Sequence, residues 1–441
     1  MIATTQLANT LAMPAIELLR SLLNAALAAA APEGCLPTHL PAPPRGRTVV
    51  VGAGKAAAAM AQTVEAHWPA TQSICGLVVT PYGHTLPAGE HGRRIEVIEA
   101  AHPLPDAAGV VAAQRMLAMV AGLSENDLVL TLLSGGGSAL LVAPRPGLTL
   151  ADKRAITQSL LRSGASIAEI NCVRRHLSAI KGGRLALAAA PARVLTLAIS
   201  DVPGDDLATI ASGPTVPDPS TLADAQTICA RYSIAFPQVG AGETAIAESP
   251  LPTETAIWRA TDHARCSARV IATAQSSLSA AAEVARAAGI TPLVLGDRIE
   301  GEAREVAKAL AGIALSCFHA GTPLPRPCVL LSGGETSVTL RDQSGRGGRN
   351  TEFLLALAIA LDGHPGIYAL AADTDGIDGS EDNAGAVITP DSLKRLRAAG
   401  LDARQLLDNN DAYRAFLATD DLIVTGPTRT NVNDFRAILL L

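Results

Sequence analysis

Short runs of β-branched and other apolar residues alternate with alanine- and leucine-rich stretches along nearly the whole chain, and this alternation strongly constrains the fold. The alanine- and leucine-rich stretches have the length and spacing of helices. Strand–helix alternation is typical of α/β folds with mostly parallel sheets. Continuous apolar runs such as LVLTLL agree, because parallel strands are buried on both faces. The predicted strands are 48–51, 76–80, 95–99, 128–133, 194–200, 269–272, 292–295, 328–332, 367–371 and 422–424, and the predicted helices include 56–67, 107–121, 151–162 and 276–288.

The length of the chain predicts more than one domain. It has 441 residues, and a domain takes about 150 residues, so two or three domains are expected. The segment 231–262 carries several prolines and glycines and lacks a clear hydrophobic period, which indicates a boundary. The sequence therefore predicts two Rossmann-like α/β domains, 1–245 and 262–441, with mostly parallel sheets and an active-site cleft between the domains.

The composition excludes several classes of protein. Apolar residues make up 48% of the chain, which excludes disorder as the dominant state. Aromatic residues make up only 2%, so the core must be built from Ala, Leu, Val and Ile. The formal net charge is −6, and proteins that coat nucleic acid need a basic surface. No nucleic-acid partner is expected.

The cysteines and the N-terminal segment bear on the compartment. The seven cysteines are an odd number and none forms a C-x-x-C pair, so a disulfide framework is not expected. Residues 11–31 are apolar, but no Lys or Arg precedes Arg20 and Glu17 interrupts the run. Because a signal peptide carries its positive charge before the apolar stretch, an amphipathic helix is the better interpretation. We expect a cytoplasmic protein with no membrane partner.

A glycine-containing turn follows the first predicted strand. Gly52, Gly54 and Lys55 belong to a G-x-G-x-x-A pattern, in which glycines let the backbone approach a phosphate at a helix N-terminus. A nicotinamide dinucleotide site also needs an acidic residue at the end of the next strand. No acid follows that strand until Glu90. Lys55 therefore favours an anionic substrate or a phosphoryl group, and the alternative is a tight turn with a solvated lysine.

A triglycine loop follows the strand 128–133. Three consecutive glycines expose backbone N–H groups that can bind an anion, and the two flanking serines add hydroxyl donors. The alternative is a crowded turn that needs positive φ angles. The Walker pattern G-x-x-x-x-G-K-[ST] is absent, which argues against a P-loop nucleotide site. The loop residues are Ser134, Gly135, Gly136, Gly137 and Ser138.

A basic segment lies between residues 171 and 183. Asn171 is predicted to cap a helix that Gly182 terminates. Arg174 and Lys181 are seven residues apart, which would place them on one helix face two turns apart. They are candidates to bind an anionic substrate, and the alternative is a solvated basic helix.

Carboxylates cluster after two of the predicted strands. Asp201 follows the strand 194–200, and Asp373 and Asp375 follow the strand 367–371. Carboxylate oxygens are the ligands that Mg²⁺ prefers, so these three residues are candidate metal ligands. The alternative is a set of Asx turns.

The second half of the chain contains a glycine loop and a glycine–arginine loop. The segment SGGET follows the strand 328–332, and GRGGRN leads into a predicted helix. Arginine in a flexible loop suits bidentate recognition of phosphate, and a solvated loop is the alternative. The segment 425–434 after the last predicted strand is polar and rich in carboxamides. Candidate phosphate-binding residues here are Gly333, Gly334, Glu335, Thr336, Arg349 and Asn350. Together the motifs favour an enzyme of phosphoryl transfer.

Eight motifs in one order carry a resemblance to a known family. They are GAGKA, SGGGSALL, N-x-VRRHLS-x-x-KGG, SDVPGDD with ASGPT, SGGETSV, GRGGRN, DTDGIDG and TGPTRTNVND. From about residue 16 to residue 435 the chain resembles the glycerate 2-kinase family, whose C-terminal part is called the MOFRL domain. The resemblance implies phosphorylation of D-glycerate at the 2-hydroxyl with ATP and Mg²⁺. It also implies that the key lysine is Lys55 and the key arginine is Arg349.

The interpretation that follows assigns roles to these residues. Lys55 and Arg349 would neutralise the transferring phosphoryl group, and Asp201 would orient the hydroxyl or bind Mg²⁺. Arg174 and Lys181 would hold the glycerate carboxylate. Two alternatives stay open, an NAD(P)H-dependent reductase of hydroxypyruvate, a name that many relatives carry, and a non-catalytic sensor of phosphorylated metabolites. The oligomeric state, including a homo-oligomer, is also open.

Overall fold

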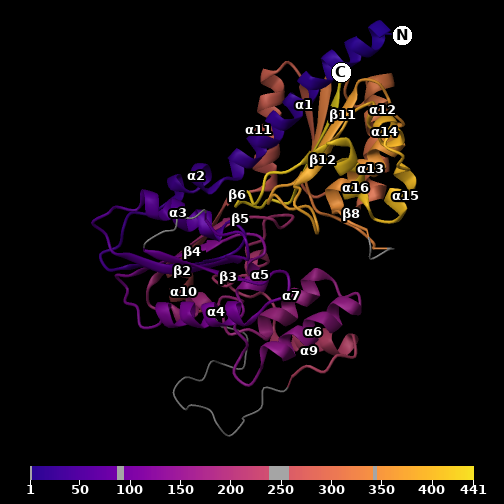
Figure 1. Ribbon diagram of the computed structural model, residues 1–441. Helices are drawn as coiled ribbons and strands as arrows, with labels where there is room; N and C mark the ends of the chain where they lie inside the picture. Colours follow the sequence, from indigo (N-terminus) through magenta and orange to yellow (C-terminus); the bar gives the residue numbers. More distant parts are fainter. Residues whose placement is uncertain (1, 87–93, 238–257, 341–344) are drawn as a thin grey trace. The chain divides into compact units, whose positions relative to one another are not determined.

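The computed structural model describes residues 2–86, 94–237, 258–340 and 345–441. The chain forms two compact units (Figure 1). One is Pro32–Ile271, and the other combines Met1–Ala31 with Ala272–Leu441. The units differ from the expected domains because the first 31 residues belong with the second half of the chain. The expected boundary at 245–262 lies largely outside the described residues.

The unit Pro32–Ile271 contains a six-stranded sheet in the order β3-β2-β1-β4-β5-β6. The pairings of β2 with β3 and β1, and of β4 with β1 and β5, are parallel, as predicted. Strands β1 and β4 are buried along their whole length, which explains their uninterrupted apolar sequences. The strands are β1 Thr48–Ala53, β2 Ile74–Pro81, β3 Ile95–Ala100, β4 Leu128–Leu133, β5 Arg193–Ile199 and β6 Cys266–Ala272.

Helices in this unit begin at conventional caps. Thr149 and Asp152 form a capping box at α6, and Ser166 and Glu169 form one at α7. The predicted helix between Asn171 and Gly182 is therefore corrected, because Asn171 lies inside α7 and the helix ends at His176. The helices are α2 Pro32–Cys35, η1 Pro37–His39, α3 Ala57–His67, α4 Ala107–Val120, α5 Gly137–Leu140, α6 Leu150–Arg162, α7 Ile167–His176, α8 Arg184–Ala188, η2 Ile210–Ser212, α9 Leu222–Arg231 and α10 Ala260–Arg265.

The second unit contains a mixed six-stranded sheet in the order β13-β12-β11-β14-β9-β7. Only the pairing of β7 with β9 is parallel, and the other four pairings of these described strands are antiparallel. The α/β class is confirmed, but the mostly parallel pairing expected for both domains does not extend to this sheet. The cause is two unpredicted strands, β14 between β11 and β9 and β12 between β11 and β13, each antiparallel to both of its neighbours. The strands are β7 Thr291–Gly296, β9 Cys328–Ser332, β11 Ile367–Asp373, β12 Gly385–Ile388, β13 Leu422–Ile423 and β14 Asp434–Leu440, with β8 Gly301–Glu302 and β10 Thr336–Ser337 forming a separate parallel pair.

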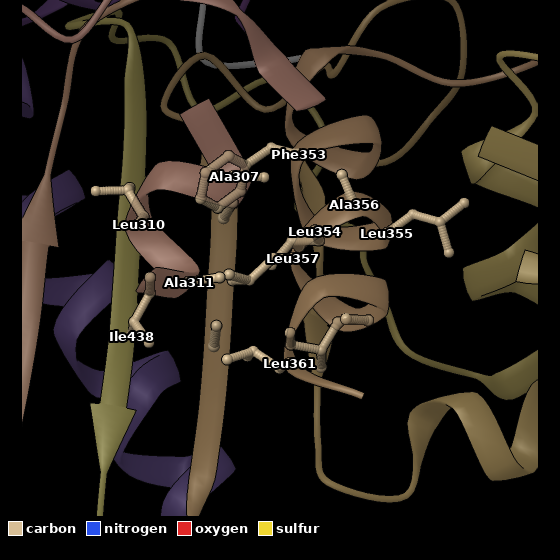
Figure 2. Close-up of a cluster of buried hydrophobic side chains, with 14 of the residues drawn as sticks. Ala307, Leu310, Ala311, Phe353, Leu354, Leu355, Ala356, Leu357, Leu361 and Ile438 are labelled. Carbon is tan, nitrogen blue, oxygen red and sulfur yellow. The ribbon is translucent and has the colours of Figure 1, made fainter. Parts of the chain in front are cut away.

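Apolar side chains pack on both faces of this sheet. Figure 2 shows one face, where Leu310 of α12 and Phe353 of α13 lie among leucines and alanines over Ile438 of β14. Ala437 and Leu439 of the same strand belong to the core on the opposite face, because successive side chains of a strand alternate. With few aromatic residues, close packing of alanine against leucine forms both cores.

The second core explains why the N-terminal helix belongs to this unit. In Figure 1, α1 lies along α11. Leu19, Leu22 and Leu23 of α1 are buried with Leu278 of α11, and Ser277 Oγ donates to Ala26 O at 2.7 Å. The amphipathic pattern predicted the helix but not its partner. The helices here are α1 Ile2–Ala30, α11 Ala274–Ala287, α12 Ala303–Ala320, α13 Arg349–Leu361, α14 Ser392–Ala398, α15 Ala403–Asp408 and α16 Ala412–Thr419.

Among the described residues, no single helix meets the length and hydropathy needed to cross a membrane, although the consecutive segments Pro14–Ala30 and Pro32–His39 meet the test as a bent pair.

Candidate functional site

The loops that follow β1 and β4 are in direct contact. The backbone N–H of Ala56 donates to Ser134 Oγ at 2.9 Å, and the N–H of Lys55 donates to Gly135 O at 2.9 Å. The two strands are parallel neighbours, so their carboxyl ends meet at one edge of the sheet. The structure thus brings Lys55 next to the triglycine loop, as the sequence predicts for ligand-binding loops.

The glycines of the first turn are required by close packing. Gly54 has φ of +139°, and a Cβ on it would lie 2.1 Å from Ser134 Oγ. A Cβ on Gly52 would lie 2.3 Å from Leu132 O. Both positions face β4 or the loop after it. The G-x-G pattern therefore explains how β1 and its turn fit against β4, which is a structural reason for the glycines.

Asp201 lies at the same edge of this sheet. Strand β5 pairs with β4 up to Ala198 and Leu133, and Asp201 follows its last residue, Ile199, by two positions. Its side chain is partly exposed. A carboxylate, a lysine and a loop of backbone N–H groups therefore follow three adjacent strands.

Lys181 is buried beneath the triglycine loop. It is only 1% exposed, and its Nζ donates to Ser138 O at 2.8 Å and to Ser138 Oγ and Ala211 O at 3.3 Å. Burial, together with the positive charges of Arg174 and Lys153, places the pKa of Lys181 well below its usual value. These contacts make Lys181 a support of the loop; its predicted contact with a substrate carboxylate stays a prediction.

A second segment that Lys181 contacts, the turn at residues 211–212, has an unusual backbone. Ala211 and Ser212 have φ angles of +51° and +60°, although neither is glycine. This region costs about 1–2 kcal/mol for each such residue. The Ser212 Oγ lies 2.7 Å from Ser138 Oγ, and Ser212 O accepts from Gly182 N at 3.1 Å. Lys181 and these bonds hold the strained turn against the triglycine loop, and strain of this kind clusters at functional sites.

In the other unit, Arg349 is held by three carboxylates. Its Nε lies 2.7 Å from Asp434 Oδ1, its Nη2 lies 2.8 Å from Asp373 Oδ2 and its Nη1 lies 2.9 Å from Glu335 Oε1. The side chain of Asp434 is 0% exposed and that of Glu335 is 51% exposed. Burial acts to lower the pKa of the Arg349 guanidinium, but the three carboxylates outweigh it and the pKa is raised. Asp434 and Asp373 are thus fixed partners, while Glu335 is a partner that solvent reaches.

Asp434 connects Arg349 to the rest of the cluster. Its Oδ1 also accepts from Asn350 Nδ2 at 2.8 Å, and its Oδ2 forms a close ion pair with the fully buried Arg436. Arg436 in turn donates to Gly333 O and Thr336 Oγ1, both at 3.0 Å. The structure thereby gathers the predicted residues Gly333, Glu335, Thr336, Arg349, Asn350 and Asp373 around one buried carboxylate.

The N-terminus of α13 is already capped. Asp378, which is fully buried, accepts from Asn350 N at 2.9 Å and from Thr351 N at 2.8 Å. Burial raises the pKa of Asp378 in spite of these bonds. The first amides of α13 are therefore taken by a carboxylate of the chain, and the predicted contact of Arg349 with a phosphate stays a prediction.

Beside this cluster lies a cavity of about 570 Å³. Its walls include Thr336, Arg349, Glu352 and Asn410 together with glycines of the GRGGRN loop. Glu352 is held by Arg304 at 2.7 Å and by Asn410 Nδ2 at 2.9 Å. Arg349 therefore lines a cavity of the size of a small-molecule site.

Two of the three carboxylates predicted to bind Mg²⁺, Asp373 and Asp375, lie at the end of β11. Asp373 Oδ1 accepts from Asp375 N at 3.1 Å, and Asp375 Oδ1 accepts from Ile377 N at 2.8 Å. Within the described ranges, no group of three or more His, Cys, Asp or Glu side chains is arranged to hold a metal. Mg²⁺ is commonly held by one or two carboxylates together with substrate phosphates, so this donor set is compatible with it.

Three residues of these sites escaped the sequence interpretation. Asp434 and Arg436 lie in the unpredicted strand β14, and Asp378 was not among the candidate site residues. The feature of the sequence that could have revealed them is the polar segment TRTNVND, which leads into β14. Its residues Asn433 and Asp434 reach Thr374 and Arg349 of the same unit.

Comparison with known proteins places the chain among described families. Residues 18–241 match the family model "Domain of unknown function (DUF4147)", and residues 328–434 match the MOFRL family. The chain is 38% identical over 423 residues to the D-glycerate 2-kinase of Thermotoga maritima, covering 95% of this chain and 96% of that protein. It is 55% identical over 426 residues to a putative hydroxypyruvate reductase of Agrobacterium vitis, covering 96% of this chain and 94% of that protein.

A solved structure agrees with these matches. The crystal structure of glycerate kinase from Thermotoga maritima has a TM-score of 0.85 and 36% identity, covering 98% of this chain and 100% of that one. The resemblance predicted from the eight motifs is confirmed, and the chain belongs to the family of the glycerate 2-kinases, with a DUF4147 region followed by a MOFRL region.

Proposed function

We propose that the protein phosphorylates D-glycerate at the 2-hydroxyl to give 2-phosphoglycerate, with ATP as the donor and Mg²⁺ as the metal. The observation that carries the proposal is the position of Arg349. Buried Asp434 and Asp373 fix two edges of its guanidinium, and the third edge pairs with the half-exposed Glu335. Arg349 is also one of the residues that line a cavity. An anionic phosphoryl group can take the place of Glu335 on that edge.

The names of the relatives support the same reaction. A D-glycerate 2-kinase and a glycerate 2-kinase are each 38% identical to this chain over most of its length. Phosphoryl transfer needs positioning and positive charge rather than covalent chemistry from the protein. Lys55 and Arg349 supply that charge in this proposal, and the loop 134–138 supplies backbone N–H groups.

The remaining roles follow from chemistry at the strand ends. Asp201 orients the attacking hydroxyl or accepts its proton, because it is the partly exposed carboxylate after β5. Mg²⁺ bound by Asp373 and Asp375 would neutralise charge on the nucleotide phosphates. Arg174 is retained as a cation for the carboxylate of glycerate. Lys181 keeps the loop under Ser138 in place.

A reductase is the second candidate because two relatives more than 50% identical carry the name putative hydroxypyruvate reductase. A dinucleotide would need a carboxylate at the end of β2 to bind the ribose. Strand β2 ends at Pro81, and the described residues 82–86 contain no acid. The nearby Glu99 comes from β3 and accepts from Gly83 N at 2.7 Å. These observations favour the kinase.

Two assays on the purified protein separate the candidates. The first contains D-glycerate, ATP and Mg²⁺, with ADP release coupled to a readout and the product identified by ³¹P NMR. The second contains hydroxypyruvate with NADH or NADPH, followed at the nicotinamide absorbance. The proposal expects ADP release that depends on glycerate, with 2-phosphoglycerate as the product. Oxidation of reduced nicotinamide without ADP release would overturn it.

A further inference from the structure

Basic side chains converge on the C-terminal end of α7 in the unit Pro32–Ile271. Arg145 Nη1 donates to His176 O at 3.1 Å, and Arg184 Nη1 donates to Arg175 O at 3.2 Å and to Lys181 O at 3.0 Å. The basic side chains that surround this point are Arg145, Lys153, Arg174, Arg175, His176, Lys181 and Arg184, and all except Arg174 are buried.

The negative charge close to these basic side chains comes from Asp218. Asp218 has a side chain with 0% exposure, and its Oδ1 lies 2.9 Å from Arg175 Nε. Its Oδ2 lies 3.6 Å from His176 Nε2. Asp218 is therefore engaged by Arg175 and His176 on the α7 side of the cluster. Lys153 and Arg184 have no carboxylate at ion-pair distance among the described residues.

Lys153 and Lys181 differ in whether their ammonium groups have hydrogen-bond partners. Both are buried, but Lys181 Nζ has three oxygen acceptors. Lys153 is 6% exposed, and its Nζ has no hydrogen-bond partner within the part of the chain that the structure describes. Nη2 of Arg184 is also buried without a partner there. Burying a donor that has no hydrogen-bond partner costs free energy. Such a group often marks the position of an ion or a water molecule that binds at the site.

The surroundings of Lys153 all favour negative charge. The helix α6 begins at a capping box on Thr149, and Lys153 lies in the first turn of that helix, where the helix dipole is positive. Burial first, and then the charges of Arg174 and Arg184, lower the pKa of Lys153 to about 7. Arg174, which is partly exposed, has its own pKa lowered by burial. Charged groups of α6, α7 and α8 thus disfavour the ammonium unless an anion is present.

We propose that Lys153, Arg174 and Arg184 form a binding site for an oxyanion, either a phosphate or a carboxylate group, beside α7. Lys153 supplies ammonium donors, Arg184 supplies the vacant Nη2 donor, and the partly exposed Arg174 supplies the third positive charge. The site shares Arg174 with the contact to the glycerate carboxylate proposed above, whereas Lys153 and Arg184 have no role in that proposal. Lys153 was not singled out in the sequence, where it is one lysine in an ordinary amphipathic helix.

The test measures binding of inorganic phosphate to the purified full chain by isothermal titration calorimetry and thermal shift. Potassium chloride at the same ionic strength is the reference, and no nucleotide is present. We expect phosphate to bind and to raise the melting temperature of the wild type. Lys153→Met should weaken phosphate binding at least 10-fold. Lys394→Met is the matched control, because Lys394 is exposed on α14, and it should bind phosphate as the wild type does.

Arg174→Gln is the second variant, since a partly exposed side chain can be changed with little risk to folding. It too should weaken phosphate binding several-fold. Titration of D-glycerate against bound phosphate separates the two sources: competition identifies a carboxylate ligand, and independent binding identifies free phosphate. The proposal fails if the wild type binds neither anion, or if Lys153→Met and Arg174→Gln bind phosphate with wild-type affinity. The binding measurements contain no nucleotide, and Lys153 has no role in the proposed reaction, so failure here is distinct from failure of that reaction. Arg174→Gln is used for phosphate binding alone, because Arg174 is also proposed to hold the glycerate carboxylate.

Discussion

Arg349 Nε lies 2.7 Å from Asp434 Oδ1, which joins the first residue of α13 to the first residue of β14. The two residues are 85 positions apart. Asp434 also contacts Asn350 and Arg436. The orientation of the arginine proposed to act on the phosphoryl group is therefore set by a strand at the far end of the chain.

Replacement of Asp434, the buried partner of Arg349, should cost far more than replacement of its exposed partner Glu335. Asp434→Asn leaves Arg349 and the buried Arg436 without their shared negative charge, so we expect a loss of about 3–5 kcal/mol in the free energy of unfolding. Glu335→Gln should cost about 1 kcal/mol or less, because an exposed ion pair contributes little. Urea unfolding of both variants measures the difference. Equal losses would contradict the assignment of Asp434 as the fixed partner.

Lys55→Ala should separate activity from stability. Lys55 follows β1 at the sheet edge and is partly exposed, so its removal creates no cavity in the core. If it stabilises the transferring phosphoryl group, kcat should fall by roughly 10²–10³-fold, the usual effect of losing one preorganised donor. The melting temperature should stay near that of the wild type. Lys394→Ala serves as the control, and wild-type turnover in Lys55→Ala would remove the residue from the mechanism.

Gly54→Ala should destabilise the protein strongly. The new Cβ would lie 2.1 Å from Ser134 Oγ, and φ at this position is +139°. Backbone strain and overpacking together should cost about 3 kcal/mol or more. Gly122→Ala is the matched control, with a positive φ but no atom within 4 Å of the added Cβ, and it should cost about 1–2 kcal/mol. Thermal unfolding of the two variants measures this, and a cost for Gly54→Ala no larger than that of the control would show that the turn relaxes.

The stability of the wild type relative to Lys153→Met should depend on pH. The pKa of Lys153 is lowered to about 7 in the folded protein from 10.5. Between these values the unfolded chain binds one more proton at this residue than the folded chain does, so stability rises with pH. The wild type should therefore gain stability relative to Lys153→Met from pH 7 to about pH 10, and the variant should be the more stable of the two at pH 6.

Urea unfolding at intervals of pH measures this difference, and taking the difference removes the titration of groups whose pKa does not depend on Lys153, such as His176. Added phosphate should reduce the slope, because a bound anion favours the ammonium of Lys153. Parallel stability curves for the two proteins would show that Lys153 holds an ordinary pKa.

Local sequence was enough to predict much of the fold. Apolar runs of strand length, such as 128–133 and 328–332, form strands with the predicted bounds. Their own apolar side chains favour burial. The loops after β1 and β4, with Lys55 and Ser134 among their residues, lie together at one sheet edge because these two strands are parallel neighbours. The glycine motifs were interpreted as loops that approach a phosphate, and the structure adds a packing reason for Gly52 and Gly54, which lie against β4 and the loop after it.

Long-range pairing decided the rest. The sequence determined that β14 would be apolar at 437–440, but only its position between β11 and β9 makes Asp434 and Arg436 buried partners of the glycine–arginine loop. The pattern of α1 determined a helix, while the face offered by α11 decided which unit it joins. The local sequence predicted that Lys153 lies in a helix. Its lowered pKa arises from burial and from the arginines that tertiary packing brings beside its Nζ, which has no hydrogen-bond partner among the described residues. Backbone preference and burial pattern are properties of neighbouring residues, whereas the energy of a buried charge depends on every group that the fold places around it.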